Sequence, residues 1–197
     1  STKTKIREFW GDTAKQWFSS FDDTLSFESL SLNLELLESL LIDRSHLATR
    51  EINLNNLQGK LVLEVGCGAG ATSALFCHHG ASVVATDITP ERVQLTSNKL
   101  ALVRNKNNPE RQPIAMAFEA DAENLPFQDN SFDIVYSNGV LHHTENTEKA
   151  IEEIYRVVKP GGKCAVMLYS RHSATYWLSL LPKGIISGEV FRLPEAE

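Results

Sequence analysis

The sequence predicts an α/β fold in which a mostly parallel β-sheet lies between layers of helices. From Leu61 onward, short apolar runs alternate with longer segments of helical periodicity, which is the pattern of consecutive β-α-β units. A glycine-rich turn follows the first apolar run, and such a turn between a strand and a helix lets a ligand approach the backbone closely. The chain has 197 residues, which is the size of one domain with a substantial core.

The N-terminal segment is predicted to be helical. Residues 5–22 carry apolar and aromatic side chains in a helical stripe. Leu30, Leu34, Leu37 and Leu41 then mark one apolar face of an amphipathic helix.

We therefore expect an N-terminal helical cap over residues 1–58 and an α/β domain over residues 59–197. The aromatic stripe on a terminal segment also suggests that residues 1–22 form a mobile lid, which would exclude water from a bound ligand.

Strands and helices alternate in the second segment. The start of the helix at Pro90 is the clearest, because Thr89 can cap it, proline suits its first position and Glu91 follows. The predicted strands are residues 61–65, 82–87, 114–119, 132–137 and 163–169, and the predicted helices are residues 71–79, 90–104, 147–158 and about 173–181.

The glycine-rich turn indicates a cofactor of the nucleotide type. Residues 61–71 read LVLEVGCGAGA, so an apolar strand ends in an acid and then turns through glycines. The following helix would place backbone N–H groups beside the ligand. Gly66, Gly68 and Ala71 fit the dinucleotide pattern G-x-G-x-x-[GA], whereas Gly66, Gly68 and Gly70 fit the pattern E-x-G-x-G-x-G of S-adenosylmethionine (SAM) enzymes. The glycines alone leave both cofactors open.

Polar residues at the ends of later strands extend the predicted site, because ligands of parallel sheets bind beyond the carboxyl ends of the strands. Asp87 ends the second strand, where its carboxylate can accept hydrogen bonds from both hydroxyls of a ribose. Asp121 and the N–H of Ala122 follow the third strand and can read the edge of adenine. Asn138 follows the fourth strand, where the chain passes under the cofactor. The alternative roles are a helix cap for Asp87 and a plain turn for Asp121.

Composition argues against several other classes of protein. The net charge is −6 and no strong Lys/Arg cluster is present, which argues against binding to a nucleic-acid backbone. The three cysteines form no C-x-x-C pair and indicate reduced thiols in a cytoplasmic protein. No apolar run is long enough to span a membrane, and the polar start is unlike a signal peptide.

Taken together, the chain resembles the class I SAM-dependent methyltransferases, particularly the group that acts on small molecules. The resemblance covers residues 60–170 and lies in five segments in the family's order, LEVGCGAG, VVATDIT, ADAENLPF, FDIVYSNGVLHH and VVKPGG. It implies a Rossmann-like three-layer α/β/α fold with SAM as the cofactor and a small-molecule acceptor.

The resemblance also implies roles for individual residues. Glu64 would support the glycine turn, and the turn itself would face the methionine part of SAM. Asp87 would hold the ribose with Ile88 against adenine, and Asn138 would lie near the methionine. The implied cofactor residues are Glu64, Gly66, Cys67, Gly68, Gly70, Asp87, Ile88, Asp121, Ala122 and Asn138.

Methyl transfer mainly requires that the nucleophile, the methyl carbon and the sulfur be aligned in a site that excludes water. An acceptor that carries a proton also needs a base, and His142 or His143 is the best candidate. The alternative is that these histidines pack or cap the helix that begins near Thr147. A metal site at His142, His143 and Glu145 is not expected, because adjacent histidines should point apart.

Two other functions remain open. Tyr155 and Lys159 form the Y-x-x-x-K pair of short-chain reductases, but Pro160 follows the lysine and disfavours a shared helical turn. Tyr155 is moreover expected in the core, on one face with Ile151, Ile154 and Val158. The second alternative is a regulatory protein that binds SAM without catalysis.

The acceptor pocket is expected to be aromatic. Its candidate wall residues are Phe9, Trp10, Trp17, Tyr169, Tyr176 and Trp177. The alternative, which is the commoner role of such residues, is a core stripe. An apolar or ring-bearing small molecule would suit such a wall.

The chain also ends early for the family it resembles. The family's sheet continues with two further strands, whereas only 28 residues follow Tyr169. We therefore expect a truncated chain or a shortened member, with about five parallel strands, a helix over residues 173–181 and at most a short strand over residues 189–193. The fifth strand would then form an apolar edge, through which a homodimer could form.

Overall fold

The computed structural model describes residues 2–18, 34–39, 41–42, 47–104 and 113–169. Ser1–Met167 forms one compact unit, to which every helix and strand below belongs. Leu168–Glu197 forms a second unit. The expected helix at residues 173–181 and strand at residues 189–193 lie outside the described residues, as do Leu30, Tyr176 and Trp177.

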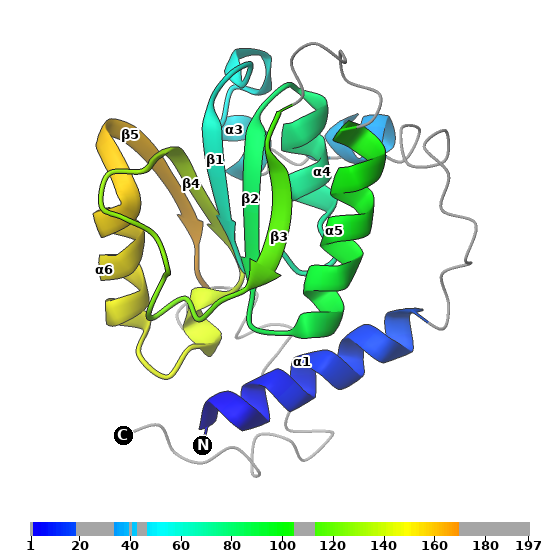
Figure 1. Ribbon diagram of the computed structural model, residues 1–197, viewed down its shortest axis with the longest axis vertical. Helices are drawn as coiled ribbons and strands as arrows, with labels where there is room; N and C mark the ends of the chain where they lie inside the picture. Colours follow the sequence, from blue (N-terminus) through cyan, green and yellow to red (C-terminus); the bar gives the residue numbers. More distant parts are fainter. Residues whose placement is uncertain (1, 19–33, 40, 43–46, 105–112, 170–197) are drawn as a thin grey trace, which may run out of the picture. The chain divides into compact units, whose positions relative to one another are not determined.

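A five-stranded sheet forms the centre of the first unit (Figure 1). Its strands are β1 (Leu61–Val65), β2 (Ser82–Asp87), β3 (Ala115–Glu119), β4 (Phe132–Asn138) and β5 (Val158–Met167). All neighbouring strands are parallel and their order is β3-β2-β1-β4-β5. The predicted fold class is confirmed, and the strands agree with prediction to within one residue except at β5.

Strand β5 begins earlier than predicted. Val158 already pairs with Phe132, and an irregular stretch follows before Lys163 pairs with Ile134. Residues 159–162 therefore lie inside the strand as a bulge, with Gly161 at a φ of 75°. Within the described residues β3 and β5 are the two edges of the sheet, and self-association through the β5 edge stays a prediction.

Helices cover both faces of the sheet. On one face lie α4 (Ala71–His78) and α5 (Pro90–Arg104), and on the other lies α6 (Thr147–Val157) (Figure 1). Other helices in the described part of the chain are α1 (Thr2–Phe18), α3 (Leu47–Arg50), η1 (Leu54–Asn56) and η2 (Leu141–His143). The three-layer α/β/α arrangement is therefore confirmed.

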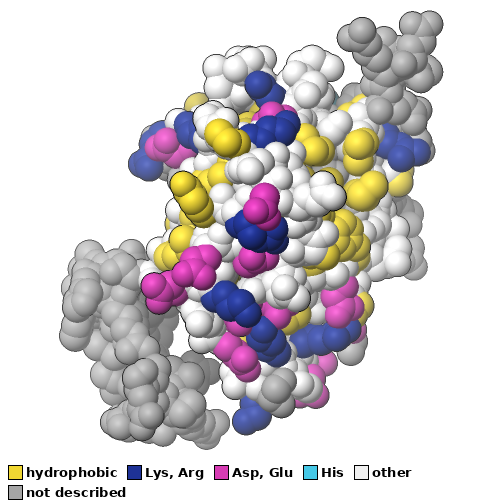
Figure 2. Space-filling view, turned by 60° about the vertical axis from the view of Figure 1, so that its left-hand side comes forward, with side chains coloured by type: hydrophobic (Ala, Val, Ile, Leu, Met, Phe, Trp, Pro, Cys, Tyr) yellow, Lys and Arg dark blue, Asp and Glu magenta, His cyan; other side chains and the backbone are white. Residues whose placement is uncertain are grey.

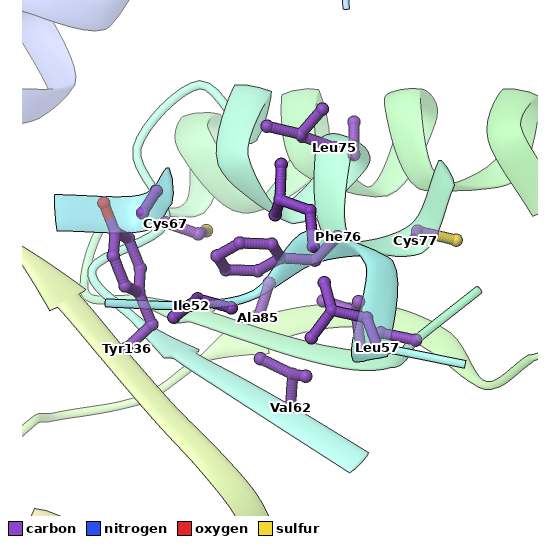
Figure 3. Close-up of a cluster of buried hydrophobic side chains, with 14 of the residues drawn as sticks. Ile52, Leu57, Val62, Cys67, Leu75, Phe76, Cys77, Ala85 and Tyr136 are labelled. Atoms are coloured by element: carbon purple, nitrogen blue, oxygen red, sulfur yellow. The ribbon is translucent and has the colours of Figure 1, made fainter. Parts of the chain in front are cut away.

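The core under α4 also includes residues that precede the sheet. Phe76 of α4 meets Tyr136 of β4 edge to face, with ring centroids 5.3 Å apart (Figure 3). Ile52 and Leu57 pack in the same cluster, and so does Leu34 of the helical residues 34–39. The N-terminal segment thus shares a core with the sheet, and the predicted boundary between residues 1–58 and 59–197 stays a prediction.

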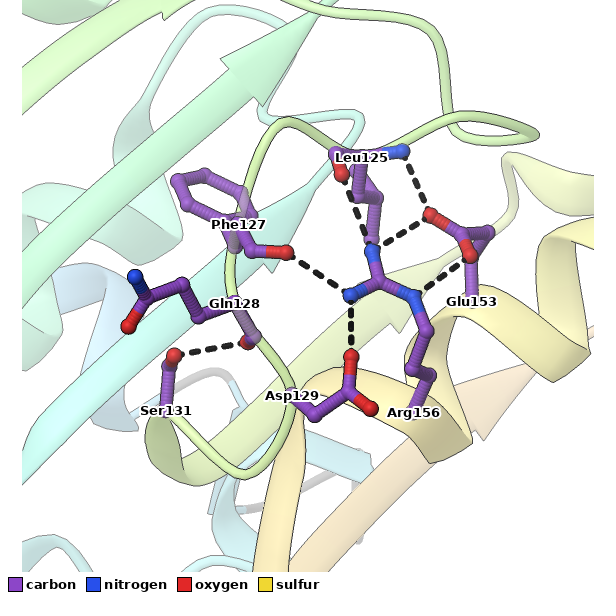
Figure 4. Close-up of polar contacts among 7 residues, drawn as sticks. All are labelled: Leu125, Phe127, Gln128, Asp129, Ser131, Glu153 and Arg156. Carbon is purple, nitrogen blue, oxygen red and sulfur yellow. Dashed lines mark hydrogen bonds and ion pairs between the residues drawn. The ribbon is translucent and has the colours of Figure 1, made fainter.

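On the face of the sheet that α6 covers, Arg156 of α6 binds the loop between β3 and β4 (Figure 4). Its guanidinium donates to the carbonyls of Leu125 (3.0 Å) and Phe127 (2.7 Å) and to the carboxylate of Asp129 (2.8 Å). It also pairs with Glu153, whose carboxylate accepts the N–H of Leu125 at 2.7 Å. One side chain therefore closes a loop that has little secondary structure of its own.

The buried face of α6 differs from the predicted one by about one residue position around the helix. The buried residues are Ala150, Ile154 and Val157, whereas Tyr155 is 79% exposed and Ile151 is 43% exposed. The reason is that the spacing i, i+4, i+7 follows the buried stripe, and Tyr155 lies about 100° away from Ile154 around the helix. Lys159 has left the helix, as expected, and pairs with Asp133 at 2.8 Å.

Thr89 begins helix α5 as predicted, because its backbone accepts the first hydrogen bonds of the helix. The prediction that its side chain caps the helix is wrong. The carbonyl of Thr89 accepts from the N–H groups of Arg92 and Val93, both at 3.1 Å. The buried hydroxyl of Thr89 makes no hydrogen bond within the described part of the chain. Asp87 instead accepts the N–H of Thr89 at 3.0 Å, so a preceding side chain fixes the start of the helix.

The surface carries mixed charge. On the face in Figure 2, basic and acidic side chains are interspersed among apolar ones, without a broad basic patch over the described residues. No helix in the described ranges is both long and apolar enough to cross a membrane.

Candidate cofactor site and active site

A cavity of about 290 Å³ lies at the carboxyl ends of β1, β2 and β4. Ten of the twelve predicted site residues line it, and Gly70 and His142 do not. The lining residues are Lys3, Ile6, Trp10, Glu64, Val65, Gly66, Cys67, Gly68, Thr72, Asp87, Ile88, Arg92, Ala120, Asp121, Ala122, Glu123, Asn138, Gly139, Val140, His143, Thr144 and Glu145.

The glycine turn forms one wall of this cavity. Gly66 has a φ of 75°, and a Cβ added to it would lie 2.4 Å from the side chain of Val140. Its position therefore excludes any larger residue. Gly70 has a different role, because a Cβ there would lie 2.8 Å from the Cα of Thr96. Gly70 thus lets α4 and α5 approach each other and does not line the cavity.

Asp87 links the glycine turn to the end of β2. One carboxylate oxygen accepts the N–H of Gly68 and the other accepts the N–H of Thr89, both at 3.0 Å. The residue is 9% exposed and lines the cavity. Each carboxylate oxygen has a second lone pair, so the same group can still accept hydrogen bonds from a ligand.

Glu64 and Cys67 are buried beside Asp87. The carboxylate of Glu64 accepts a hydrogen bond from the hydroxyl of Ser73. Burial raises the pKa of Glu64 to about 8, and the charge of Asp87 adds to this effect, while the bond from Ser73 opposes it. Burial also raises the pKa of the Cys67 thiol. At neutral pH both groups are therefore mainly protonated, and the thiol is not a nucleophile.

The acidic end of the cavity holds a lysine that the sequence analysis did not identify. Lys3 of α1 pairs with Asp121 at 2.5 Å and with Glu123 at 3.0 Å. Its backbone N–H donates to Glu145 at 3.1 Å. The other oxygen of Asp121 accepts the N–H of Glu123 at 3.0 Å. The hydrogen bonds to Asp121 and Glu123 raise the pKa of Lys3.

Helix α1 supplies a further cavity wall through Trp10. The guanidinium of Arg92 lies 5.0 Å from the centre of the indole ring, and its Nε donates to the carbonyl of Trp10 at 3.4 Å. The ring of His143 meets the same indole at a centroid distance of 5.2 Å and an angle of 67°. Trp10 was predicted as a wall residue, whereas Arg92 was missed. Of the other predicted wall residues, Phe9 is 64% exposed and Tyr169 is 63% exposed.

The two candidate bases differ in position. His143 lines the cavity and His142 does not. Their rings do not point apart as expected, because the short helix η2 leaves the centroids 4.0 Å apart. Burial lowers the pKa of both imidazoles, and the neighbouring His142 lowers that of His143 further. His143 is therefore mainly neutral at pH 7 and can accept a proton.

The geometry does not favour the alternative chemistries. Tyr155 and Lys159, which match the Y-x-x-x-K pattern of the alternative reductase function, do not line the cavity. Among the described residues, no three histidine, cysteine or acidic side chains are grouped as a metal site would need.

Comparisons with known proteins agree with the fold. Residues 63–166 match a family described as a methyltransferase domain. A ubiquinone biosynthesis O-methyltransferase from Coxiella burnetii is 31% identical over 138 residues, which cover 65% of this chain and 55% of the relative. A demethylmenaquinone methyltransferase from Paenarthrobacter aurescens is 33% identical over 122 residues, covering 62% of this chain and 44% of the relative. The chain thus matches about half the length of these relatives.

Solved structures show the same fold. The YcgJ protein from Bacillus subtilis is 28% identical with a TM-score of 0.52, and the match covers 62% of this chain and 50% of that one. The magnesium protoporphyrin IX methyltransferase from Synechocystis, solved with bound S-adenosylhomocysteine (SAH), has a TM-score of 0.58. At 20% identity over 98% of this chain and 80% of that one, the second match bears on the fold alone. The chain belongs to this methyltransferase domain family, which is one of the class I SAM-dependent methyltransferase families.

Proposed function

We propose that the protein transfers the methyl group of SAM to a hydroxyl group on a small aromatic acceptor. The observation that carries this proposal is the cavity itself, which has the glycine turn and Asp87 on one side and Trp10 and His143 on another. The names of the relatives support a small-molecule acceptor, because one names ubiquinone biosynthesis and the other names demethylmenaquinone.

The cavity residues fit SAM. A volume of about 290 Å³ is close to the lower end of the range of small-molecule sites, roughly 300–1,000 Å³. Asp87 would hold the ribose, Asp121 and Ala122 the edge of adenine, and Ile88 its face. Gly66, Gly68 and Asn138 would lie beside the methionine, with Glu64 and Cys67 behind the turn. When bound, SAM supplies a methyl group on a sulfonium ion, which needs no further activation.

His143 would then serve as the base for the acceptor hydroxyl. Its pKa is lowered by burial and by His142, so the neutral ring is available over the physiological pH range. The edge-to-face contact with Trp10 limits the rotation of the imidazole and leaves an aromatic wall against which an acceptor ring can pack. A phenolic hydroxyl, with a pKa of about 10, is a group that gains from such a base.

Incubation with methyl-labelled SAM tests the proposal. The panel contains a catechol, a hydroxyquinol, an aromatic amine and an aliphatic amine of similar size. Label on an oxygen of the ring compounds is the expected result. Label on nitrogen alone would contradict the proposed acceptor class. Tight retention of SAM without transfer to any of these or to components of a cell extract would favour the alternative of a non-catalytic SAM-binding protein.

Two histidine variants test the base. We expect His143→Gln to lower kcat by about 10²–10⁴-fold and to remove the acidic limb of the pH profile of kcat/KM. His142→Gln should cost much less, because His142 does not line the cavity. Equal losses in both variants, with unchanged pH profiles, would indicate that the pair only packs η2.

A further inference from the structure

We propose that Lys3 is a positioning residue that holds the first turn of α1 closed over the adenine end of the cofactor site. The exchange of SAM and SAH then requires the contacts of Lys3 to open. This inference rests on the proposed assignment of Asp121 to the adenine edge, and it adds a residue that lies outside the sequence motifs.

Lys3 joins two separate loops. Its ammonium lies between Asp121 and Glu123 in the segment after β3, at 2.5 Å and 3.0 Å. Its backbone N–H donates to Glu145 in the segment between η2 and α6. Glu123 in turn accepts the N–H of Asn146 at 3.1 Å. Closing α1 therefore fixes the adenine-reading segment and the segment beside the candidate base at the same time.

The electrostatics explain why a cation is needed at this position. The side chain of Glu123 is only 6% exposed, and those of Asp121 and Lys3 are 30% and 33% exposed. Without Lys3, two neighbouring carboxylates, one of them nearly buried, would lack the cation that now lies between them. Their repulsion would favour movement of the segment that carries Asp121. The carboxylate of Glu145 also contacts the first turn of α1 through the N–H of Lys3, and the helix dipole favours a negative charge at this end of a helix.

The contact encloses the cavity without filling it. The space of about 290 Å³ remains beneath α1, with Lys3, Ile6 and Trp10 among its walls. Asp121 uses one oxygen for Lys3 and the other for the N–H of Glu123. Since each oxygen can accept a second hydrogen bond, an adenine amino group and Lys3 can share this carboxylate. Closure of α1 and binding of the cofactor are therefore compatible.

Arg7 provides a matched control on the same helix. It pairs with Glu119 at 2.8 Å, and the two side chains are 45% and 43% exposed. Neither residue lines the cavity. Arg7→Met therefore removes an ion pair between α1 and the sheet without changing the acids of the site.

The experiment compares SAH binding by wild type, Lys3→Met, Lys3→Arg and Arg7→Met. Calorimetry gives Kd, and stopped-flow tryptophan fluorescence gives the dissociation rate. We expect Lys3→Met to weaken binding about tenfold, as for the loss of one charge-assisted contact, mainly through faster dissociation. Lys3→Arg should recover most of the affinity, and Arg7→Met should stay within about twofold of wild type, as expected for an exposed pair. Salt should speed SAH dissociation more in wild type than in Lys3→Met.

Proteolysis of α1 supplies a second readout. SAH should protect α1 from limited proteolysis in wild type and in Arg7→Met, and should protect it much less in Lys3→Met. Wild-type dissociation and protection in Lys3→Met would overturn the proposal. Tighter SAH binding by Lys3→Met would also overturn it, because Lys3 would then compete with adenine for Asp121. A wild-type protein that binds no SAH would instead refute the cofactor assignment, and the role of Lys3 with it.

Discussion

Replacing Glu64 with glutamine should make the stability of this protein less dependent on pH. Glu64 is 4% exposed, and burial raises its pKa from its ordinary value of 4.5 to about 8. The unfolded chain loses this proton near pH 4.5, whereas the folded protein keeps it until about pH 8. Folding therefore takes up a proton between these values, and this contribution to stability is full below pH 4.5 and is lost as the pH rises to 8.

The magnitude follows from proton linkage. One proton of difference changes the free energy of unfolding by about 1.4 kcal/mol per pH unit. Between pH 5 and pH 8, the wild type should lose about 4 kcal/mol relative to Glu64→Gln, which cannot ionise. The glutamine side chain keeps an oxygen that can accept the hydrogen bond from the hydroxyl of Ser73. The comparison of wild type with Glu64→Gln therefore isolates the effect of the charge.

Urea unfolding of both proteins at half-unit steps of pH measures this difference. The other titratable groups that face Glu64 are Asp87, the Cys67 thiol and the phenol of Tyr136. Burial and Glu64 raise the pKa of both Cys67 and Tyr136. They are present in both proteins, so the difference curve reports Glu64. A difference that stays flat from pH 5 to pH 8 would refute a raised pKa at this site.

Three further predictions test the packing around the site. Asp87→Ala should weaken SAH binding by about 1.5–3 kcal/mol, measured by calorimetry, and should also lower stability, because the N–H groups of Gly68 and Thr89 lose their acceptor; unchanged affinity would misplace the ribose site. Gly66→Ala should lower the free energy of unfolding by about 2 kcal/mol or more, since its Cβ would lie 2.4 Å from Val140; thermal melts at the wild-type temperature would contradict this. Arg156→Met should cost about 2 kcal/mol of stability through the loss of its contacts to the loop before β4, while SAH affinity stays within experimental error.

The parts of the fold that could be predicted from the sequence are those whose residues lie close together in the chain. Strand β1 and the glycine turn are adjacent in the chain, and Asp87 lies at the end of the next strand. Parallel order then brings both to one edge of the sheet by a general rule. For this reason ten predicted residues line a single cavity, although their order around a ligand still came from the resemblance.

Other features depend on contacts between distant segments and carry no local signal. Lys3 lies 118 residues from Asp121, and nothing in its sequence context separates it from Lys5. Arg156 resembles any basic residue near the end of a helix, yet it closes a loop about thirty positions earlier. Tyr155 was misplaced for a related reason. The apolar stripe of α6 is narrow, and a single step around the helix separates a core position from an exposed one.

Helix α1 shows why the acceptor is harder to infer than the cofactor. The proposed cofactor end is built mainly from residues that follow consecutive strands, so the parallel order of the strands brings them together. The proposed acceptor end combines Trp10 of α1, Arg92 of α5 and His143 of η2, and it exists only once α1 is in place. A change in the sequence of α1 would therefore alter the acceptor wall while the glycine turn and Asp87 stay as they are. Acceptor specificity in this protein should depend on α1 and η2, and exchanges of Trp10 should change the preferred acceptor before they change the affinity for SAM.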